Sequence, residues 1–251
     1  MGTGMRDGSR WILALDFSTP VGLVCLKGPE PLLSVEIDGR SRASQVFTAV
    51  RRVMDGAGLR PCNIGTIGVG RGPGSFTGVR VAVMAAKALA HVLQIPLVAP
   101  DSLEVLAMSA VEEADYVTPV LDARRGEVYT AFYRVDEGYP VSLNGPEAVS
   151  PQLAADMIRC RQEQYGGNIA ILGSGVKAYP LVWPEGIVRM DKATFSPHGL
   201  TRLCVRYAES ELTVDPLQLL PLYVRKPDAK PRFAGGDNGG IDAAVIAYDP
   251  E

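Results

Sequence analysis

Apolar positions near the start of the chain follow a strand pattern that predicts a β-hairpin. Residues 11–16 (WILALD) form a continuous apolar run that ends in a carboxylate. A Ser-Thr-Pro turn separates this run from a second apolar run at residues 21–26, so we expect two antiparallel strands with Asp16 at their turn. Residues 32–37 are expected to add a third antiparallel strand.

Beyond residue 40 the spacing of apolar residues changes to a helical period. In residues 41–59 they fall on one stripe, which predicts an amphipathic helix. The helix expected at residues 79–93 is apolar on nearly every side and should be buried on more than one face. The other elements of this first unit are a strand at 64–69, a glycine-rich segment at 70–78, a strand at 95–99 and a helix capped by Ser102 that runs to about residue 113.

A second unit opens in the same way as the first, with a strand, an Asp-bearing turn and another strand. Its expected elements are strands at 117–122, 128–134 and 169–172 and helices at 151–162 and 196–211. Duplicated lobes of this plan predict an α/β protein with the two-lobe actin-like fold, each lobe being a mixed sheet with packed helices. The predicted division is a flexible N-terminus 1–10, an N-terminal lobe 11–112 to which 213–230 can return, a C-terminal lobe 113–212 and a flexible tail 231–251.

Composition narrows the classes of function. With 251 residues, 47% of them hydrophobic and 21% charged, the chain is typical of a globular protein. Its net charge of -3 argues against an autonomous nucleic-acid-binding protein. Four scattered cysteines and two distant histidines give no metal-ligand spacing, so we expect no metal site. We also expect a cytoplasmic protein, because no export signal or apolar run of about 20 residues is visible.

The glycine-rich segment is the densest candidate for chemistry, and two interpretations of it stay open. Its backbone N–H groups could bind an anion at a helix N-terminus, or its glycines could permit close packing of a helix on the sheet. No Gly-Lys-Ser/Thr ends it, so it is not a Walker A loop. The candidate residues of the segment are Gly70, Arg71, Gly72, Gly74, Ser75, Thr77, Gly78 and Arg80.

Two aspartates occupy matching turns of the two lobes. Actin-like phosphotransferases use such residues to organise magnesium and phosphate, whereas turn aspartates also bond nearby backbone N–H groups for local reasons. Asp16 and Asp122, with Gly173 and Gly175 after a later strand, are therefore candidate positions of a vestigial nucleotide site. An autonomous actin-like, ATP-dependent phosphotransferase is the alternative function that they leave open.

Several motifs resemble those of one family in their order and spacing. They are ILALDFST at 12–19, GRGPGSFTGVRVAV at 70–83, LDARRGEVY at 121–129, ILGSG at 171–175 and PLYVRK at 221–226. Together they resemble the TsaB (YeaZ) family over residues 11 to 230. The resemblance implies a protein that acts with TsaD, TsaE and TsaC in making N6-threonylcarbamoyladenosine at position 37 of tRNAs reading ANN codons. In that family TsaB is the partner without the catalytic centre.

The same resemblance bears on catalysis. TsaD-like relatives carry an HxxxH metal pair on the first helix of the N-terminal lobe. If Ser44-Gln45 matches the family's Thr-Gln, then Ala43 and Phe47 occupy the two ligand positions, and neither side chain can bind a metal. The resemblance therefore implies no catalytic residue, no metal and no cofactor.

The resemblance further implies a heterodimer with TsaD, through which TsaE is recruited and tRNA is bound. We expect the helices at 41–59 and 79–93 to form the contact, because the second is apolar around more of its circumference than one sheet requires. The alternative is that this helix is simply enclosed within its own lobe. The same patch would support a homodimer when TsaD is absent. The expected interface residues are Phe47, Val50, Met54, Val79, Val83, Met84 and Lys87.

Overall fold

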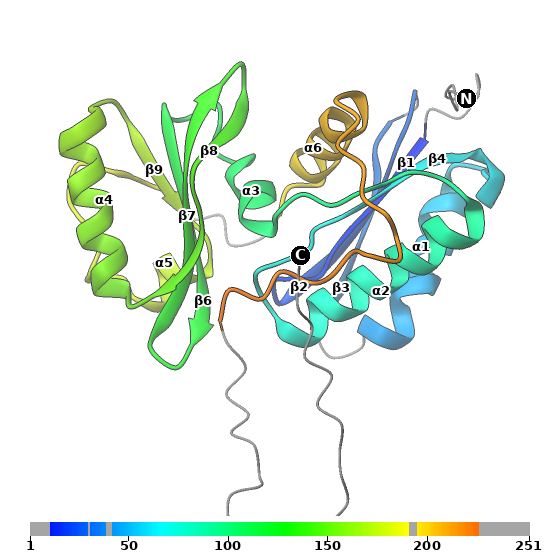
Figure 1. The fold of residues 1–251 in the computed structure, drawn as a ribbon, viewed down its shortest axis with the longest axis horizontal. Helices are drawn as coiled ribbons and strands as arrows, with labels where there is room; N and C mark the ends of the chain where they lie inside the picture. The colour runs from blue at the N-terminus through cyan, green and yellow to red at the C-terminus, as the bar shows by residue number, and fades with distance from the viewer. Residues whose placement is uncertain (1–10, 30, 39–41, 191–194, 226–251) are drawn as a thin grey trace, which may run out of the picture.

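The protein has two lobes, each built on a five-stranded mixed sheet (Figure 1). The computed structural model describes residues 11–29, 31–38, 42–190 and 195–225. The ends that were expected to be flexible, 1–10 and 231–251, lie outside the described residues.

The first sheet has the strand order β3-β2-β1-β4-β5. Strand β2 is antiparallel to both of its neighbours, β1 and β3, whereas β4 and β5 run parallel to β1. The predicted hairpin and third strand are confirmed. The strands are β1 (Trp11–Asp16), β2 (Val21–Lys27), β3 (Leu33–Asp38), β4 (Ile64–Val69) and β5 (Leu97–Val98). Strand β5 is shorter than the predicted 95–99, because the Ile95 N–H bonds back to Ala90 of the preceding helix and Pro96 has no N–H to donate.

The second sheet repeats the plan of the first. Its order is β10-β9-β6-β7-β8, with β6, β7 and β8 antiparallel and β9 and β10 parallel to β6. This repeated strand order and direction confirms the predicted two-lobe actin-like α/β fold. The strands are β6 (Tyr116–Arg124), β7 (Glu127–Asp136), β8 (Tyr139–Val149), β9 (Ile169–Leu172) and β10 (Val188–Arg189), of which β8 and β10 were not predicted.

Helices α1 (Arg42–Gly56) and α2 (Phe76–Leu93) contact one another and pack on the first sheet. Helix α2 begins three residues before the predicted start because the Ser75 Oγ caps it by accepting a hydrogen bond from the Gly78 N–H. Helix α1 ends before the predicted residue 59, where Gly58 adopts the left-handed conformation (φ +65°) typical of helix C-termini. A short 3-10 helix (Pro61–Asn63) leads into β4.

Helices α3 (Ser102–Ala107) and α6 (Pro197–Glu209) lie between the two sheets (Figure 1). Helix α6 packs on β1, β2 and β4, although the predicted boundaries placed it in the C-terminal lobe. Gly68 makes this packing possible, because an added Cβ there would overlap the Cys204 sulfur of α6. The predicted boundary of the lobes is therefore wrong for this helix, since its apolar stripe is buried against the first sheet.

The other face of the second sheet carries α4 (Pro151–Tyr165) and α5 (Ser174–Ala178). Helix α4 begins as predicted, after a serine cap in which Ser150 Oγ accepts a hydrogen bond from the Leu153 N–H. Its inner stripe, which includes Ile158, is buried against Phe132 and the other strand residues. Helices α4 and α5 thus cover this face of the second sheet.

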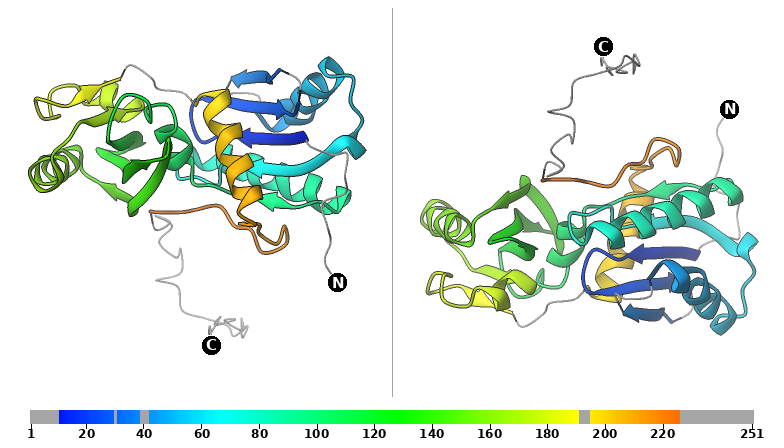
Figure 2. Two further views of the ribbon diagram at one scale, coloured as in Figure 1. Left: turned by 90° about the horizontal axis from the view of Figure 1, so that it is seen from above. Right: turned by 90° about the horizontal axis from the view of Figure 1, so that it is seen from below.

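After α6 the chain forms an extended segment, residues 213–225, which we call the strap (Figure 2). Val214 forms a bridge with Leu97 of β5, and Leu219 is buried in the first core. The Lys87 ammonium of α2 donates hydrogen bonds to the carbonyl oxygens of Leu217 and Leu219, at 3.3 and 2.8 Å. The strap therefore covers part of α2 before it reaches the second lobe.

Candidate functional site

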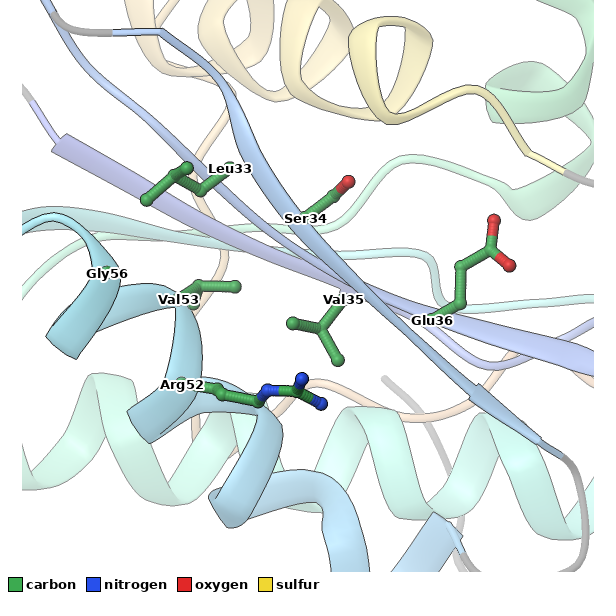
Figure 3. Close-up of a pocket in the computed structure, with 7 residues that line it drawn as sticks. All are labelled: Leu33, Ser34, Val35, Glu36, Arg52, Val53 and Gly56. Atoms are coloured by element: carbon green, nitrogen blue, oxygen red, sulfur yellow. The ribbon is translucent and has the colours of Figure 1, made fainter.

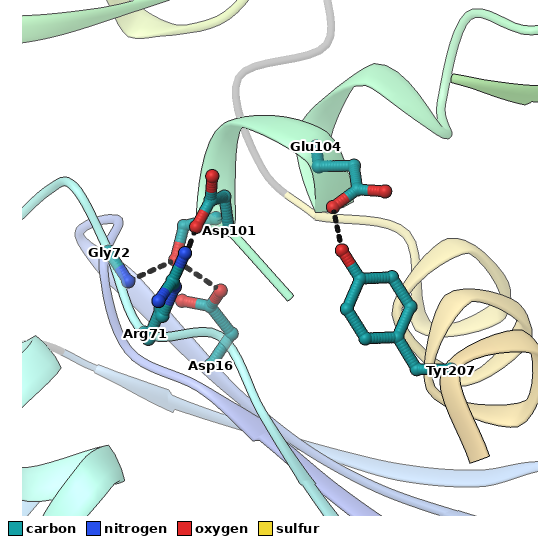
Figure 4. A network of polar contacts seen from close by, with 7 residues as sticks. Asp16, Arg71, Gly72, Asp101, Glu104 and Tyr207 are labelled. Carbon is teal, nitrogen blue, oxygen red and sulfur yellow. Dashed lines mark hydrogen bonds and ion pairs between the residues drawn. The ribbon is translucent and has the colours of Figure 1, made fainter. Parts of the chain in front are cut away.

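Asp16 is fully buried at the end of β1, and both of its carboxylate oxygens accept hydrogen bonds. Figure 4 shows Asp16 beside Arg71 and Gly72 of the glycine-rich segment. Oδ1 accepts a bond of 2.7 Å from the Ser18 N–H, and Oδ2 accepts one of 2.8 Å from the Ser102 hydroxyl. The turn bond to Ser18 is the local chemistry expected of a turn aspartate. The bond from Ser102 ties Asp16 to α3.

Ser102 also holds the glycine-rich segment. Its Oγ accepts a hydrogen bond of 3.0 Å from the Gly72 N–H, and its own N–H donates to the Gly72 carbonyl at 2.8 Å. Ser102 was predicted to cap a helix, which is wrong, because Asp101 occupies the N-cap position and Ser102 is the first helical residue. Helix α3 also ends at Ala107, earlier than the predicted residue 113.

The glycines of this segment permit close packing. An added Cβ on Gly70 would overlap Asp16 Oδ2, and one on Gly74 would overlap the Ser18 carbonyl oxygen. Gly72 has φ +102°, a conformation that favours glycine. Three amides of the segment already donate to carbonyl oxygens, namely Gly70 to Leu15, Arg71 to Pro100 and Ser75 to Ser18. These contacts favour the packing interpretation over an anion cradle.

The two arginines of the segment, Arg71 and Arg80, contact the strap. Arg71 Nε donates to Asp101 Oδ1 at 2.7 Å, and the Arg71 carbonyl accepts the Leu222 N–H. Arg80 donates to the Tyr223 hydroxyl at 2.7 Å and lies over the Phe76 ring, 3.8 Å from its centroid. Thr77 is exposed and Gly78 is buried in the first turn of α2.

A pair that the sequence did not indicate lies beside this network. The Tyr207 hydroxyl of α6 donates to Glu104 Oε2 of α3 at 2.6 Å (Figure 4). Burial raises the pKa of Glu104 from 4.5 to about 7, with the Tyr207 hydrogen bond opposing and the nearby Asp101 carboxylate adding to the shift. Burial also raises the pKa of Tyr207. The two residues are 103 positions apart, so no local pattern could have linked them.

The second lobe holds a counterpart of the Asp16 turn. Asp122 Oδ1 accepts a hydrogen bond of 2.9 Å from the Arg124 N–H. Asp16 Oδ1 accepts the Ser18 N–H in the same way, so each aspartate binds the amide two residues further on. Ser174, the first residue of α5, accepts the Asp122 N–H at 3.0 Å. Gly173 (φ +112°) and Gly175 bring α5 so close to β6 that an added Cβ on Gly173 would overlap the Val120 carbonyl. Here too, turn chemistry and packing explain the candidate nucleotide-site residues.

The expected interface residues divide into a surface set and a core set. Phe47 and Met84 are 55% and 64% exposed, and Lys87 is half-buried beside the strap. The other four face the first sheet, because they lie on the apolar stripes that α1 and α2 turn toward it. The structure therefore corrects the prediction for these buried residues, Val50, Met54, Val79 and Val83.

A separate hollow of about 420 Å³ lies between β3 and α1 (Figure 3). Leu33, Val35 and Val53 give it an apolar floor, and Glu36 and Arg52 are the charged residues of its lining. Strand β3 is the edge strand of the first sheet, which leaves this hollow at the margin of the lobe. The residues that line this hollow are not those of the Asp16 network.

Two further findings concern metals and membranes. Among the residues that the structure describes, no group of three or more His, Cys, Asp or Glu residues is arranged to hold a metal ion. Within the same residues, α2 is the one helix whose length and apolar composition would suffice to cross a membrane. Its inner stripe, including Ala82 and Ala86, is buried against its own sheet.

Comparison with known proteins finds relatives that are named for tRNA modification. Residues 36–157 match the model of the family TsaD, tRNA N6-adenosine threonylcarbamoyltransferase. The tRNA threonylcarbamoyladenosine biosynthesis protein TsaB of Escherichia coli K12 is 30% identical over 231 residues, which are 89% of this chain and 98% of that protein. The Bacillus subtilis TsaB protein is 35% identical over 51% of this chain and 56% of its own length. The solved structure of YeaZ from Pseudomonas aeruginosa is 30% identical, with a TM-score of 0.74, over 85% of this chain and 99% of that one.

Proposed function

The chain belongs to the TsaB (YeaZ) family of tRNA threonylcarbamoyladenosine biosynthesis proteins, and from this premise we propose that it is the non-catalytic partner of the threonylcarbamoyltransferase TsaD. The observation that carries the proposal is the match over nearly the whole length of the E. coli relative. In this role the chain supports formation of N6-threonylcarbamoyladenosine at position 37 of tRNAs reading ANN codons, in the cytoplasm. TsaE joins through the complex with TsaD.

The residues at the candidate catalytic positions support a role without catalysis. Ala43 and Phe47 stand where TsaD-like relatives are expected to carry the metal pair, and hydrocarbon side chains supply no lone pair to a metal. Asp16, the acid that an autonomous phosphotransferase would need, is fully buried and accepts hydrogen bonds through both oxygens. An acid held in this way is poorly placed to organise magnesium and phosphate, which weakens the alternative function.

The exposed face of α1 and α2 is the surface that we assign to TsaD. Phe47 on α1 and Phe76, Met84 and Val92 on α2 are large apolar side chains that are more than half exposed. The two helices contact each other along the outside of the first lobe. Pairing them with two helices of a related lobe gives a four-helix interface that buries this apolar surface. The free chain would use the same face to form a homodimer.

The proposal is tested by mixing the purified chain with TsaD. We expect one complex on size-exclusion chromatography, and threonylcarbamoyl transfer to tRNA by TsaD, TsaC and TsaE that depends on this chain. The chain alone should transfer no threonylcarbamoyl group and turn over no nucleotide. Full transfer in its absence, or turnover by the chain alone that survives repurification, would overturn the proposal.

A further inference from the structure

The hairpin turn between β6 and β7 presents two adjacent arginines in a backbone conformation that arginine rarely adopts. Arg124, Arg125 and Gly126 all have positive φ, at 64°, 56° and 78°. Two-residue hairpin turns of this hand favour Asn or Asp followed by Gly, and the register shift between Asp122 and Arg124 is a bulge of the kind that re-aims a side chain. Arg124 pairs with Glu127, so the two central residues of the turn are Arg125 and Gly126, and Gly126 is the expected glycine. Arg125 takes the place of the favoured Asn or Asp, and Arg124 lies at the bulge, also with positive φ. Such strain in a well-anchored turn is typical of functional sites.

The turn is anchored from both sides. Asp122 Oδ1 accepts the Arg124 N–H at 2.9 Å. From the end of the strap, Arg225 donates to the Arg124 carbonyl at 3.3 Å and to the Glu127 carboxylate. Arg225 is thus a positioning residue that fixes the turn against the strap.

The arginine side chains remain on the surface. The Arg124 side chain is 81% exposed, and it pairs at 3.3 Å with the carboxylate of Asp122, whose side chain is 16% exposed. Arg125 is exposed as well. The carboxylates of Asp122 and Glu127 face the same turn, but Glu127 is engaged by Arg225.

We propose that Arg124 and Arg125 bind phosphate groups of the RNA backbone, so that this chain itself contributes part of the RNA-binding surface of its complex. The inference rests on the proposed function for the identity of the anion. Guanidinium groups match phosphate in a bidentate geometry, and the anchored turn fixes the backbone that carries both of them. The strap connects this turn with α2, because Lys87 bonds to one part of the strap and Arg225 at its end bonds to the turn.

The test removes both charges while keeping the turn. In the double variant Arg124→Asn/Arg125→Asn, the new residues tolerate positive φ. The control is Arg159→Gln, which removes an exposed arginine from α4. The probe is an unmodified tRNA transcript with an ANN-reading anticodon, titrated by fluorescence anisotropy from 50 to 200 mM salt against the free chain and against its mixture with TsaD.

We expect the double variant to reduce the slope of log K against log salt by about 1.5 and the control to leave it unchanged, since each phosphate contact contributes about 0.7 to 0.9. A transcript with another anticodon should show the same loss, because phosphate contacts carry no sequence information.

Three results would overturn the proposal: a wild-type chain that binds no tRNA in either state, a double variant with an unchanged slope, or a double variant that keeps the RNA slope and loses TsaD instead. The last result would show that the turn contacts a protein.

Failure of the proposed function would give a different result. In that case the wild-type chain would not join TsaD, and the slopes measured on the free chain would still decide the role of the arginines.

Discussion

The Ser102 hydroxyl donates a hydrogen bond of 2.8 Å to Asp16 Oδ2, which joins the start of α3 to the end of β1 across 86 residues of chain. The same hydroxyl accepts the Gly72 N–H. One buried serine therefore fixes three segments that are distant in sequence. The Asp16 carboxylate and the glycine-rich segment are thus held together through one hydroxyl group.

Replacing Ser102 by alanine should destabilise the protein by about 1 to 3 kcal/mol, because a buried carboxylate oxygen and a buried N–H each lose their partner. Urea denaturation would measure the loss. Ser142→Ala, which removes an exposed serine of β8, is the matched control and should change little. Equal midpoints for the two variants would contradict the structural role of Ser102.

Gly70→Ala should cost about 1 to 3 kcal/mol, since the added methyl group overlaps Asp16 Oδ2 and that carboxylate has no free space to move into. Gly145→Ala is the control, because a Cβ there meets no atom within 4 Å. Thermal unfolding of both variants measures the difference. If Gly70→Ala were as stable as the control, close packing would not be the reason for this glycine.

The sequence predicted the elements that carry a clear pattern of apolar and polar residues of their own. The strands of the first hairpin and the stripe of α1 were visible because their apolar positions repeat within one element. Strand β8 was missed, because the run SLNGPE in its middle is polar and contains Gly145 and Pro146, which are typical of turns. Its pairing with β7, a tertiary contact, overrides that local preference.

The candidate site was predictable in part. Asp16 and the glycine-rich segment stood out from their turn position and composition, but their mutual packing was not visible. That packing depends on Ser102, and the Glu104 pair depends on Tyr207, each brought in by the fold from a distant segment. The expected interface residues lie on α1 and α2, as the sequence pattern placed them, and their role in partner binding stays a prediction. The packing of α1 and α2 on the sheet decides which side chains of these helices are buried. It buries Val50 and Val83 in the first core.

Glu104 should make stability depend on pH. Its pKa is raised from 4.5 to about 7 in the folded protein, so the folded state holds this proton more tightly than the unfolded state. Stability from this group is therefore full below about pH 4.5 and is lost as pH rises through about 7. Glu104→Gln abolishes that titration. Relative to wild type, the variant should gain about 1 to 3 kcal/mol between pH 5 and pH 8, measured by urea unfolding. A constant difference over that range would contradict the assignment.

Met84→Glu should separate partner binding from folding. Met84 is 64% exposed on α2, so a carboxylate at this position stays in water in the free chain and should change its stability by less than about 0.5 kcal/mol. In a closed four-helix interface the same carboxylate would be buried without a partner, which is strongly unfavourable. TsaD binding, measured by calorimetry, should therefore be lost, and any homodimer seen by light scattering should dissociate.

The matched control for this prediction is Leu181→Glu, which introduces the same charge at a side chain that is 96% exposed in the second lobe. It should leave both folding and TsaD binding unchanged. Val83→Glu, one residue from Met84 but buried in the first core, should unfold the chain, because it places a charge beneath α2. If Met84→Glu binds TsaD as tightly as Leu181→Glu does, the partner contacts another face, and the exposed stripe of α2 needs a different explanation.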